Sequence, residues 1–333
     1  MSSTGARYGG RVREAVGDGA ARALRAGFLW ASRRRRLAQL AASSSLTRGT
    51  VRRFVAGETL PEALAVLERL HARGMATTVD VLGESVDTVA AARVAADRYL
   101  DVLAALAERG LDRNVSVKLT QLGLDVDLAV CRENLLRIVE RAAELDAFVR
   151  VDMEDHLHTA RTLELVREAH ASHPNVGVVL QAYLRRTAAD VAEMSGAGIR
   201  VRLCKGAYDE PAEVAFPRKA DVDDSFRRLA EALLRDGQYP ALATHDELLI
   251  SWVRGFVERE RIAASQFEFQ MLYGIRRDLQ ERLVAQGYTV RVYVPFGTEW
   301  YPYYMRRLAE RPANVLFMAR SVLRERRRPT RRR

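Results

Sequence analysis

Residues 291–308 read RVYVPFGTEWYPYYMRRL, and this stretch shows how the second half of the chain is organised. Its first part continues a run of β-branched and aromatic residues, 288–294, which is typical of a short strand. Pro295 and Gly297 follow directly and are expected to end that strand. Residues 300–308 then predict a helix, so the stretch describes one strand followed by one helix.

The helix at the end of this stretch carries two adjacent arginines. Residues three and four apart share a helical face, which places Tyr303 on the same face as Arg306 and Arg307. Two guanidinium groups just past a strand can bind a small carboxylate or phosphate in bidentate fashion. The plainer interpretation, considered alone, is a solvated arginine pair in an arginine-rich protein.

The same unit, a strand followed by a helix, recurs along the chain before residue 288. The expected strands are 76–81, 115–119, 148–152, 177–181, 200–204, 240–244, 267–271 and 288–294. The expected helices are 61–73, 86–109, 126–146, 157–171, 187–195, 222–236, 246–258, 276–286 and 300–308. This alternation favours an α/β fold, a parallel (β/α)8 TIM-type barrel, over an open sheet. We also expect an N-terminal helical extension over residues 9–45 and a final helix over the active-site face.

The charge of the chain is concentrated at its ends. The 333 residues carry a net charge of +10, and 48% of them are hydrophobic, enough for a sizeable core. Residues 1–57 hold 12 arginines against two acidic residues, and residues 320–333 hold eight arginines against one. Residues 58–319 are therefore left with a net charge of −7, which argues against a nucleic-acid groove in the main body. We expect a basic helical segment at 1–57, a catalytic barrel at 58–319 and a basic tail at 320–333.

The cysteines and the apolar runs of the sequence bear on the cellular compartment. Cys131 and Cys204 give neither a disulfide framework nor a metal-binding spacing, which fits a reducing environment. No uninterrupted apolar run is long enough to cross a bilayer. We expect a cytoplasmic protein without a specific nucleic-acid partner. Its basic ends could make a peripheral contact with anionic lipid at the inner face of the membrane.

Polar residues mark the C-terminal end of nearly every expected strand. They are Asp80 and Glu84, Lys118, Asp152, Gln181, Arg202 and Lys205, Thr244 and His245, and Gln270. In a (β/α)8 barrel these ends form one face, where active sites are built. Lys118 and Asp152 are expected to form an ion pair whatever the function. His156 and His158 are two residues apart and do not converge on one ligand, so no metal site is predicted.

These residues lie in motifs that resemble the proline dehydrogenase family. The matching stretches are Asp80-Val-Leu-Gly-Glu84, Ser116-Val-Lys-Leu-Thr120, Val151-Asp-Met-Glu154, Val179-Leu-Gln-Ala-Tyr183, Val201-Arg-Leu-Cys-Lys-Gly-Ala-Tyr208, Ala243-Thr-His245, Phe267-Glu-Phe-Gln-Met-Leu-Tyr-Gly274 and Tyr293 with Arg306-Arg307. They follow the family order, one per strand, across about residues 60 to 320. The size of the chain is similar to the single-activity form of the family.

The resemblance implies an FAD-dependent oxidation of L-proline to Δ1-pyrroline-5-carboxylate, the first step of proline catabolism, with electrons passed to a membrane quinone. By matched position, Arg306 and Arg307 would bind the proline carboxylate with help from Lys118, and Tyr293, Tyr303 and Leu272 would enclose the ring. Asp152 and Arg202 would tune the chemistry, and Glu84 would be the acid that gates the site. The FAD would be lined by Val151, Gln181, Arg202, Lys205, Gly206, Ala207, Thr244 and His245.

Two other functions compete with this interpretation. A related barrel flavoenzyme could act on another cyclic amine such as hydroxyproline, although a bulky Tyr293 over the ring favours proline. A non-enzymatic role in binding RNA or membranes would rest on the basic ends alone.

Overall fold

The computed structural model describes residues 49–83 and 85–310, which fall into two compact units. One unit comprises Met1–Val55 with Thr298–Arg333, and the other comprises Ala56–Gly297. The helix expected over 9–45 and the tail expected over 320–333 lie outside the described residues. The division into 1–57, 58–319 and 320–333 therefore stays a prediction.

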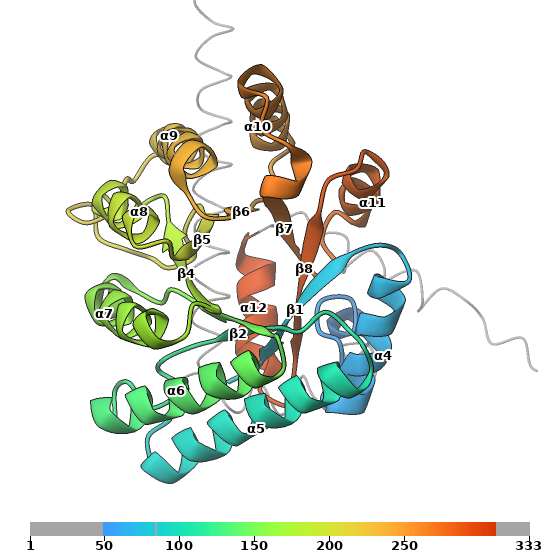
Figure 1. Cartoon of the computed structure of the whole chain (residues 1–333), viewed down its shortest axis with the longest axis vertical. Coiled ribbons are helices and arrows are strands. Elements are labelled where there is room, and N and C mark those ends of the chain that lie inside the picture. The colour runs from blue at the N-terminus through green and yellow to red at the C-terminus, as the bar shows by residue number, and fades with distance from the viewer. Residues whose placement is uncertain (1–48, 84, 311–333) are drawn as a thin grey trace, which may run out of the picture. The chain divides into compact units, whose positions relative to one another are not determined.

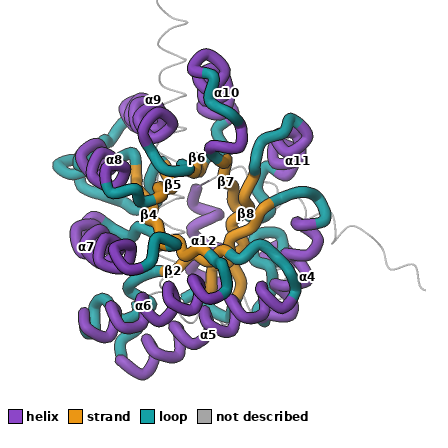
Figure 2. The backbone as a smooth tube through the Cα atoms, viewed as in Figure 1, coloured by secondary structure: helices purple, strands orange, loops and turns teal. Residues whose placement is uncertain are grey.

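The larger unit is a closed barrel of eight parallel strands in chain order, which confirms the predicted (β/α)8 fold (Figure 1). The strands are β1 (Ala76–Val81), β2 (Asn114–Val117), β3 (Phe148–Val151), β4 (Val176–Gln181), β5 (Arg200–Cys204), β6 (Ala241–Ala243), β7 (Glu268–Leu272) and β8 (Val290–Phe296). The first and last strands close the barrel through six paired residues, from Ala76 with Arg291 to Val81 with Phe296. Figure 2 shows the helices of this unit as a ring around the strands.

Short polar side chains cap the N-termini of several outer helices. The outer helices are α4 (Leu60–His71), α5 (Val89–Glu108), α6 (Leu128–Glu144), α7 (His156–Ser172), α8 (Thr187–Gly196), α9 (Lys219–Asp236), α10 (Glu247–Glu260) and α11 (Arg277–Ala285), with a 3-10 turn at Ala264–Gln266. Asp127, Asp155 and Asp246 each accept a hydrogen bond from a backbone N–H in the first turn of the helix that follows. Such caps satisfy donors that have no partner within the helix.

The last strand ends two residues later than its sequence predicts. Pro295 was expected to end it, but β8 continues to Phe296, with Pro295 paired to Asp80 in register. The prediction is wrong because proline lacks only the N–H donor. Its carbonyl still accepts a hydrogen bond from the backbone N–H of Ala56, at 2.8 Å.

The barrel separates apolar and polar side chains by strand alternation. Successive residues of a strand face opposite sides of the sheet, so the valines of β2 and β3 share one face and Ser116 and Arg150 the other. Val115, Val117 and Val149 are fully buried within the hydrophobic core. The opposite face carries the charged side chains that meet inside the barrel, and these form the site described below.

In the smaller unit, α12 (Trp300–Glu310) confirms the helix predicted from Trp300 onward. Tyr304 donates a hydrogen bond to Thr50 at 2.9 Å, and its ring lies 6.2 Å from that of Phe54. Whether this helix covers the active-site face stays a prediction. Within the described part of the chain, no helix has the length and apolarity needed to cross a membrane.

Candidate active site

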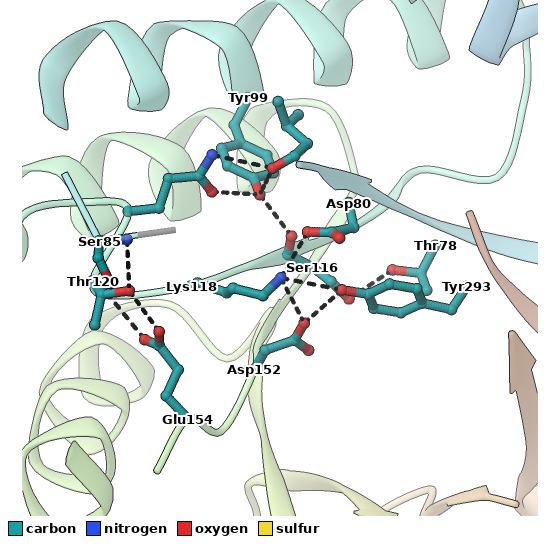
Figure 3. A network of polar contacts seen from close by, with 12 residues as sticks. Thr78, Asp80, Ser85, Tyr99, Ser116, Lys118, Thr120, Asp152, Glu154 and Tyr293 are labelled. Atoms are coloured by element: carbon teal, nitrogen blue, oxygen red, sulfur yellow. Dashed lines mark hydrogen bonds and ion pairs between the residues drawn. The ribbon is translucent and has the colours of Figure 1, made fainter. Parts of the chain in front are cut away.

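The C-terminal half of the barrel interior holds a cluster of four charged residues and one tyrosine, which lie on or directly after five different strands. Figure 3 shows four of them, Asp80, Lys118, Asp152 and Tyr293. Asp80 lies on β1, Lys118 and Asp152 directly follow β2 and β3, Arg202 lies on β5, and Tyr293 lies on β8. All five are inward-facing by strand alternation, and hydrogen bonds or ion pairs connect each of them to another. The sequence correctly predicted that polar residues would converge at this face.

Lys118 lies at the centre of the cluster. Its Nζ is 2.9 Å from Asp80 Oδ1, 3.6 Å from Asp152 Oδ2 and 3.3 Å from the hydroxyl of Tyr293. The expected Lys118–Asp152 pair therefore forms, but Asp80 is the nearer partner. An ammonium group has three N–H donors. Asp80 and Tyr293 accept hydrogen bonds from Lys118, whereas the contact with Asp152 is an ion pair beyond hydrogen-bond length.

Burial and neighbouring charges set the protonation of this cluster. Burial opposes the charged form of Lys118, but Asp80, Tyr293 and Asp152 raise its pKa well above the ordinary value. Burial raises the pKa of Asp80, and the ammonium of Lys118 opposes that rise. Burial, with Asp152 and Asp80 nearby, also raises the pKa of Tyr293 well above its usual range. Tyr293 therefore stays protonated and acts as a hydrogen-bond donor.

Asp152 is held by partners on both of its oxygens. Arg202 donates to Oδ1 and Tyr293 donates to Oδ2, each at 2.8 Å. Arg202 also donates to Ser116 Oγ at 3.0 Å, and its guanidinium lies 5.4 Å from the centre of the Tyr293 ring. Its Nε has no hydrogen-bond partner among the described residues. The cluster thus fixes the orientation of Arg202 while leaving one of its donors unused.

The loop after β5 is tied to the end of β4. Gln181 accepts a hydrogen bond from the Ala207 amide at 3.1 Å and donates to the carbonyl of Glu154 at 2.8 Å. Gly206 has a φ of +132°, and a Cβ there would lie 2.4 Å from the ring of Tyr183, so only glycine fits. Gly206 and Ala207 are exposed, which leaves this stretch of backbone accessible from solvent.

Lys205 and the residues after β6 have local partners of their own. Lys205 contacts Asp246 at 2.8 Å. The Nε2 of His245 accepts a hydrogen bond from the amide of Leu272 at 2.9 Å, so its proton resides on Nδ1 when the ring is neutral. Thr244 accepts from the amide of Asp246 at 3.1 Å. His245, Thr244 and Leu272 are thereby held at the ends of two adjacent strands.

The position of Val151 is fixed by strand pairing and burial and not by a polar contact. It is the last residue of β3 and is fully buried, so its backbone leads directly into Asp152. The backbone near Val151 is thus fixed at the rim of the barrel.

The other predicted residues lie outside the barrel unit or outside the described residues. Glu84 is not among the described residues. Tyr303, Arg306 and Arg307 lie on α12, and the guanidinium of Arg307 is 5.0 Å from the centre of the Tyr303 ring. Tyr303 and Arg307 thus lie on the same face of the helix, as their spacing predicts.

Sequence reasoning underestimated the residues that support this cluster. Asp80 received no role of its own, although it is the nearest partner of Lys118. Ser116 Oγ accepts a hydrogen bond from Arg202 and lies 3.1 Å from the hydroxyl oxygen of Thr78. The available signal was spacing, because Ser116 and Lys118 are two apart and therefore face the same way from one strand.

A second hydrogen-bonded pair was also missed. Glu154 accepts from the amide of Thr120 at 3.0 Å and from its hydroxyl at 2.5 Å (Figure 3). Burial raises the pKa of Glu154, and the bonds from Thr120 oppose this. The pair joins the loops after β2 and β3 beside Lys118.

Known proteins share both this sequence and this fold. The sequence model of the family described as proline dehydrogenase matches residues 63–320. Proline dehydrogenase 1 of Bacillus subtilis subsp. natto is 42% identical over 302 residues, which cover 91% of this chain and the whole of that protein. The chain belongs to the proline dehydrogenase family. Proline dehydrogenase of Deinococcus radiodurans is 44% identical over 278 residues, covering 81% of this chain and 89% of that protein.

A solved structure supports the same family at the level of the fold. The crystal structure of proline utilization A from Bdellovibrio bacteriovorus superposes with a TM-score of 0.74 at 29% identity. The match covers 79% of this chain but only 32% of that longer chain. Membership of the family makes this chain a proline dehydrogenase, an oxidoreductase that catalyses the first step of proline catabolism.

Proposed function

We propose that the chain oxidises L-proline to Δ1-pyrroline-5-carboxylate with FAD bound at the C-terminal face of the barrel, and that the electrons pass to a membrane quinone. The observation that carries this proposal is the buried cluster of Lys118, Asp152, Arg202 and Tyr293. It joins four residues that the family motifs contribute from four separate strands.

The residues present fit FAD. Arg202 has an unused Nε–H, Lys205 carries an ammonium group, and the backbone after β5 is exposed. Cations and backbone amides beyond a parallel strand suit phosphate and the polar edge of a flat ring. The proposed lining is Val151, Gln181, Arg202, Lys205, Gly206, Ala207, Thr244 and His245. When bound, the flavin supplies the site with a two-electron acceptor for hydride from the substrate carbon.

The protein's own groups would mainly orient the substrate. Arg306 and Arg307 would bind the proline carboxylate, while Tyr293, Tyr303 and Leu272 would enclose the ring. A bidentate pair of guanidiniums fixes which ring carbon is presented for oxidation. Glu84 would close the site by pairing with one of these arginines.

Asp152 is better suited to positioning than to removing a proton. Both of its oxygens accept hydrogen bonds, from Arg202 and Tyr293, and Lys118 lies 3.6 Å away. Each oxygen that could take a proton from the substrate already accepts a hydrogen bond from the protein. The substrate amine would therefore lose its proton to solvent before or during binding, and Asp152 would keep Arg202 and Tyr293 in place.

An absorption spectrum tests the cofactor. The purified chain should show the flavin bands, and anaerobic addition of L-proline should bleach them. A colourless protein that gains no activity on addition of FAD would refute the proposal. A colourless protein that shifts RNA in a gel would favour the nucleic-acid role of the basic ends.

Two substitutions test the carboxylate site. Arg306→Met and Arg307→Met should each raise the KM for proline at least tenfold with FAD still bound, since each removes a charge-assisted contact of about 1.5–3 kcal/mol. Arg277→Met is the matched control, because Arg277 also lies over a tyrosine ring, at 5.6 Å from that of Tyr273. Unchanged KM in both variants would refute the assignment.

We further propose that the enzyme works in the cytoplasm with a peripheral contact at the inner face of the membrane, made by its basic ends. Deleting residues 320–333 should weaken binding to anionic liposomes while leaving activity with a soluble acceptor nearly unchanged. Liposome binding should also weaken as salt is raised. Equal liposome binding by both proteins would exclude the tail as the contact.

A further inference from the structure

A polar cavity lies at the opposite end of the barrel from the proposed FAD site. It has a volume of about 750 Å3 and is lined by residues at or before the N-terminal ends of the strands. Asn114, Phe148, Asn175, Arg200 and Arg291 contribute to its wall. Cavities of this size hold small ligands, and the proposed function uses none of these residues.

Two of the three arginines that line this cavity form ion pairs with described residues, and the third does not. Arg113 pairs with Asp146 at 3.3 Å, and Arg291 pairs with Asp112 and with Glu268. Arg200, by contrast, forms no ion pair with any carboxylate of the described residues. Its guanidinium rests on aromatic rings, 5.2 Å from the centre of Phe148 and 5.4 Å from that of Tyr239.

A buried arginine behind the wall increases this excess of positive charge. Arg150 is 3% exposed and lies 4.8 Å from the centre of the same Phe148 ring. Its Nη1 donates to the carbonyls of Val178 and Arg200, its Nε has no partner, and it forms no ion pair within residues 49–83 and 85–310. The carboxylate of Glu268 offsets part of this charge from beyond ion-pair distance. An anion beside Phe148 would be stabilised by the guanidiniums of Arg150 and Arg200.

The cavity also offers acceptors that lack donors. Asn114 is 8% exposed, and its Oδ1 has no hydrogen-bond partner among the described residues. Asn175 donates through Nδ2 to the carbonyls of Val139 and Ala147, which fixes the orientation of its amide, and its Oδ1 is likewise buried without a partner. Buried polar atoms of this kind usually have a partner. Both oxygens are shielded from the cavity in this structure, so a ligand reaches them only when the asparagine side chains move, and it must then donate hydrogen bonds as well as carry negative charge.

We infer that this cavity binds a phosphate group, as free phosphate or as the monoester of a small polyol. The phosphate oxygens would face Arg200, and phosphate or ligand hydroxyls would donate to Asn114 and Asn175. The volume is larger than a lone phosphate requires and suits a monoester. The inference is independent of the proposed FAD chemistry, because the cavity lies at the other end of the strands.

Calorimetric titration tests the site in the full chain saturated with FAD, at constant ionic strength. The probes are inorganic phosphate, glycerol 3-phosphate and sulfate. We expect one molecule of phosphate or glycerol 3-phosphate per chain, with sulfate binding more weakly because it has no O–H donor near neutral pH. Arg200→Met should weaken phosphate binding at least tenfold. The matched control is Arg254→Met, since Arg254 also rests on a ring, 5.7 Å from the centre of Tyr288, outside the cavity.

A second variant keeps the test decisive if Arg200→Met does not fold. Gln238 is exposed at the rim, so Gln238→Glu should fold normally and weaken phosphate binding by charge repulsion. Several results would overturn the inference: no saturable binding of either phosphate probe, sulfate binding as tight as phosphate, or an equal loss in Arg254→Met. Unchanged affinity in the folded cavity variants would overturn it as well.

Discussion

Replacing Lys118 with methionine is the sharpest test of the charged cluster inside the barrel. The change keeps most of the side-chain volume and removes one positive charge from between two carboxylates. Asp152 would retain Arg202 as a counter-charge at 2.8 Å. Asp80 would lose its ion pair, and its Oδ2 already has no partner among the described residues.

The cost follows from how deeply these groups are buried. The side chains of Lys118 and Asp80 are 11% and 1% exposed, so solvent cannot replace the lost contact. Removing one partner of a buried pair costs about 3–5 kcal/mol in the free energy of unfolding. Lys219→Met is the matched control, because Lys219 pairs with Asp223 but its side chain is 74% exposed. That variant should lose no more than about 1 kcal/mol.

The pH dependence identifies Asp80 as the source of the cost. Burial already raises the pKa of Asp80, and removing the ammonium group raises it further. The folded variant then holds a proton on Asp80 at pH values where the unfolded chain has lost it. The stability of Lys118→Met relative to the parent should therefore fall as pH rises through the already raised pKa that Asp80 has in the parent, and recover as pH is lowered toward the ordinary value of 3.8.

Chemical denaturation at several pH values measures these differences, with Asp80→Asn and the double variant completing a cycle. Because the two groups contact each other, the double variant should be more stable than the sum of the single losses predicts, by about 0.5–3 kcal/mol. Additive losses, or a Lys118→Met cost as small as that of the control, would refute the reasoning.

Three further predictions concern other parts of the structure. Gly206→Ala should lower the Tm by several degrees, since a Cβ there would lie 2.4 Å from the ring of Tyr183. Gly110→Ala should lower the Tm less, because a Cβ there would meet nothing within 4 Å, and equal shifts in the two variants would contradict the prediction. Tyr293→Ser should raise the hydroxyproline-to-proline ratio of kcat/KM in steady-state assays, while Tyr293→Phe, which keeps the ring, should leave that ratio nearly unchanged. Burial opposes the charged form of His158, but the hydrogen bonds that its ring donates, foremost to Asp125, raise its pKa above 6.5, so its contribution to stability is present below pH 6.5 and lost as pH rises through the raised pKa. Asp125→Asn should lower that pKa in an NMR titration, and an unchanged value would exclude the contact.

Most of the fold could be predicted because local patterns determine it. Alternation such as Val115-Ser-Val117 marks strands with two different faces, and glycines such as Gly74 and Gly110, both at positive φ, follow helices. Pro295 misled the prediction because the N–H that proline lacks ends a strand only where pairing needs that donor. The sequence does not show whether a given position needs it.

The partners within the site were harder to predict than its members. Lys118 could be assigned to the active-site face from its position after a strand, but its nearest partner depends on how two strands are aligned. Asp80 pairs in register with Ser116, two residues before Lys118, and this alignment brings the carboxylate within 2.9 Å of the ammonium. Register arises from packing of the whole barrel, and no local pattern specifies it.

The way the barrel closes also affects how the chain folds as it is made. The seam between β1 and β8 joins Ala76 to Arg291, so residues that pair across it lie 291 − 76 = 215 positions apart in the chain, and the two strands pair over six positions. At about 5–20 residues per second, a ribosome needs on the order of 10–40 s to make the chain between them. During that time the outer edge of β1 has no strand to pair with, and exposed edges are sites of aggregation. Slow synthesis of the second half of the barrel should therefore increase the demand for chaperones, even though the finished barrel has no free edge.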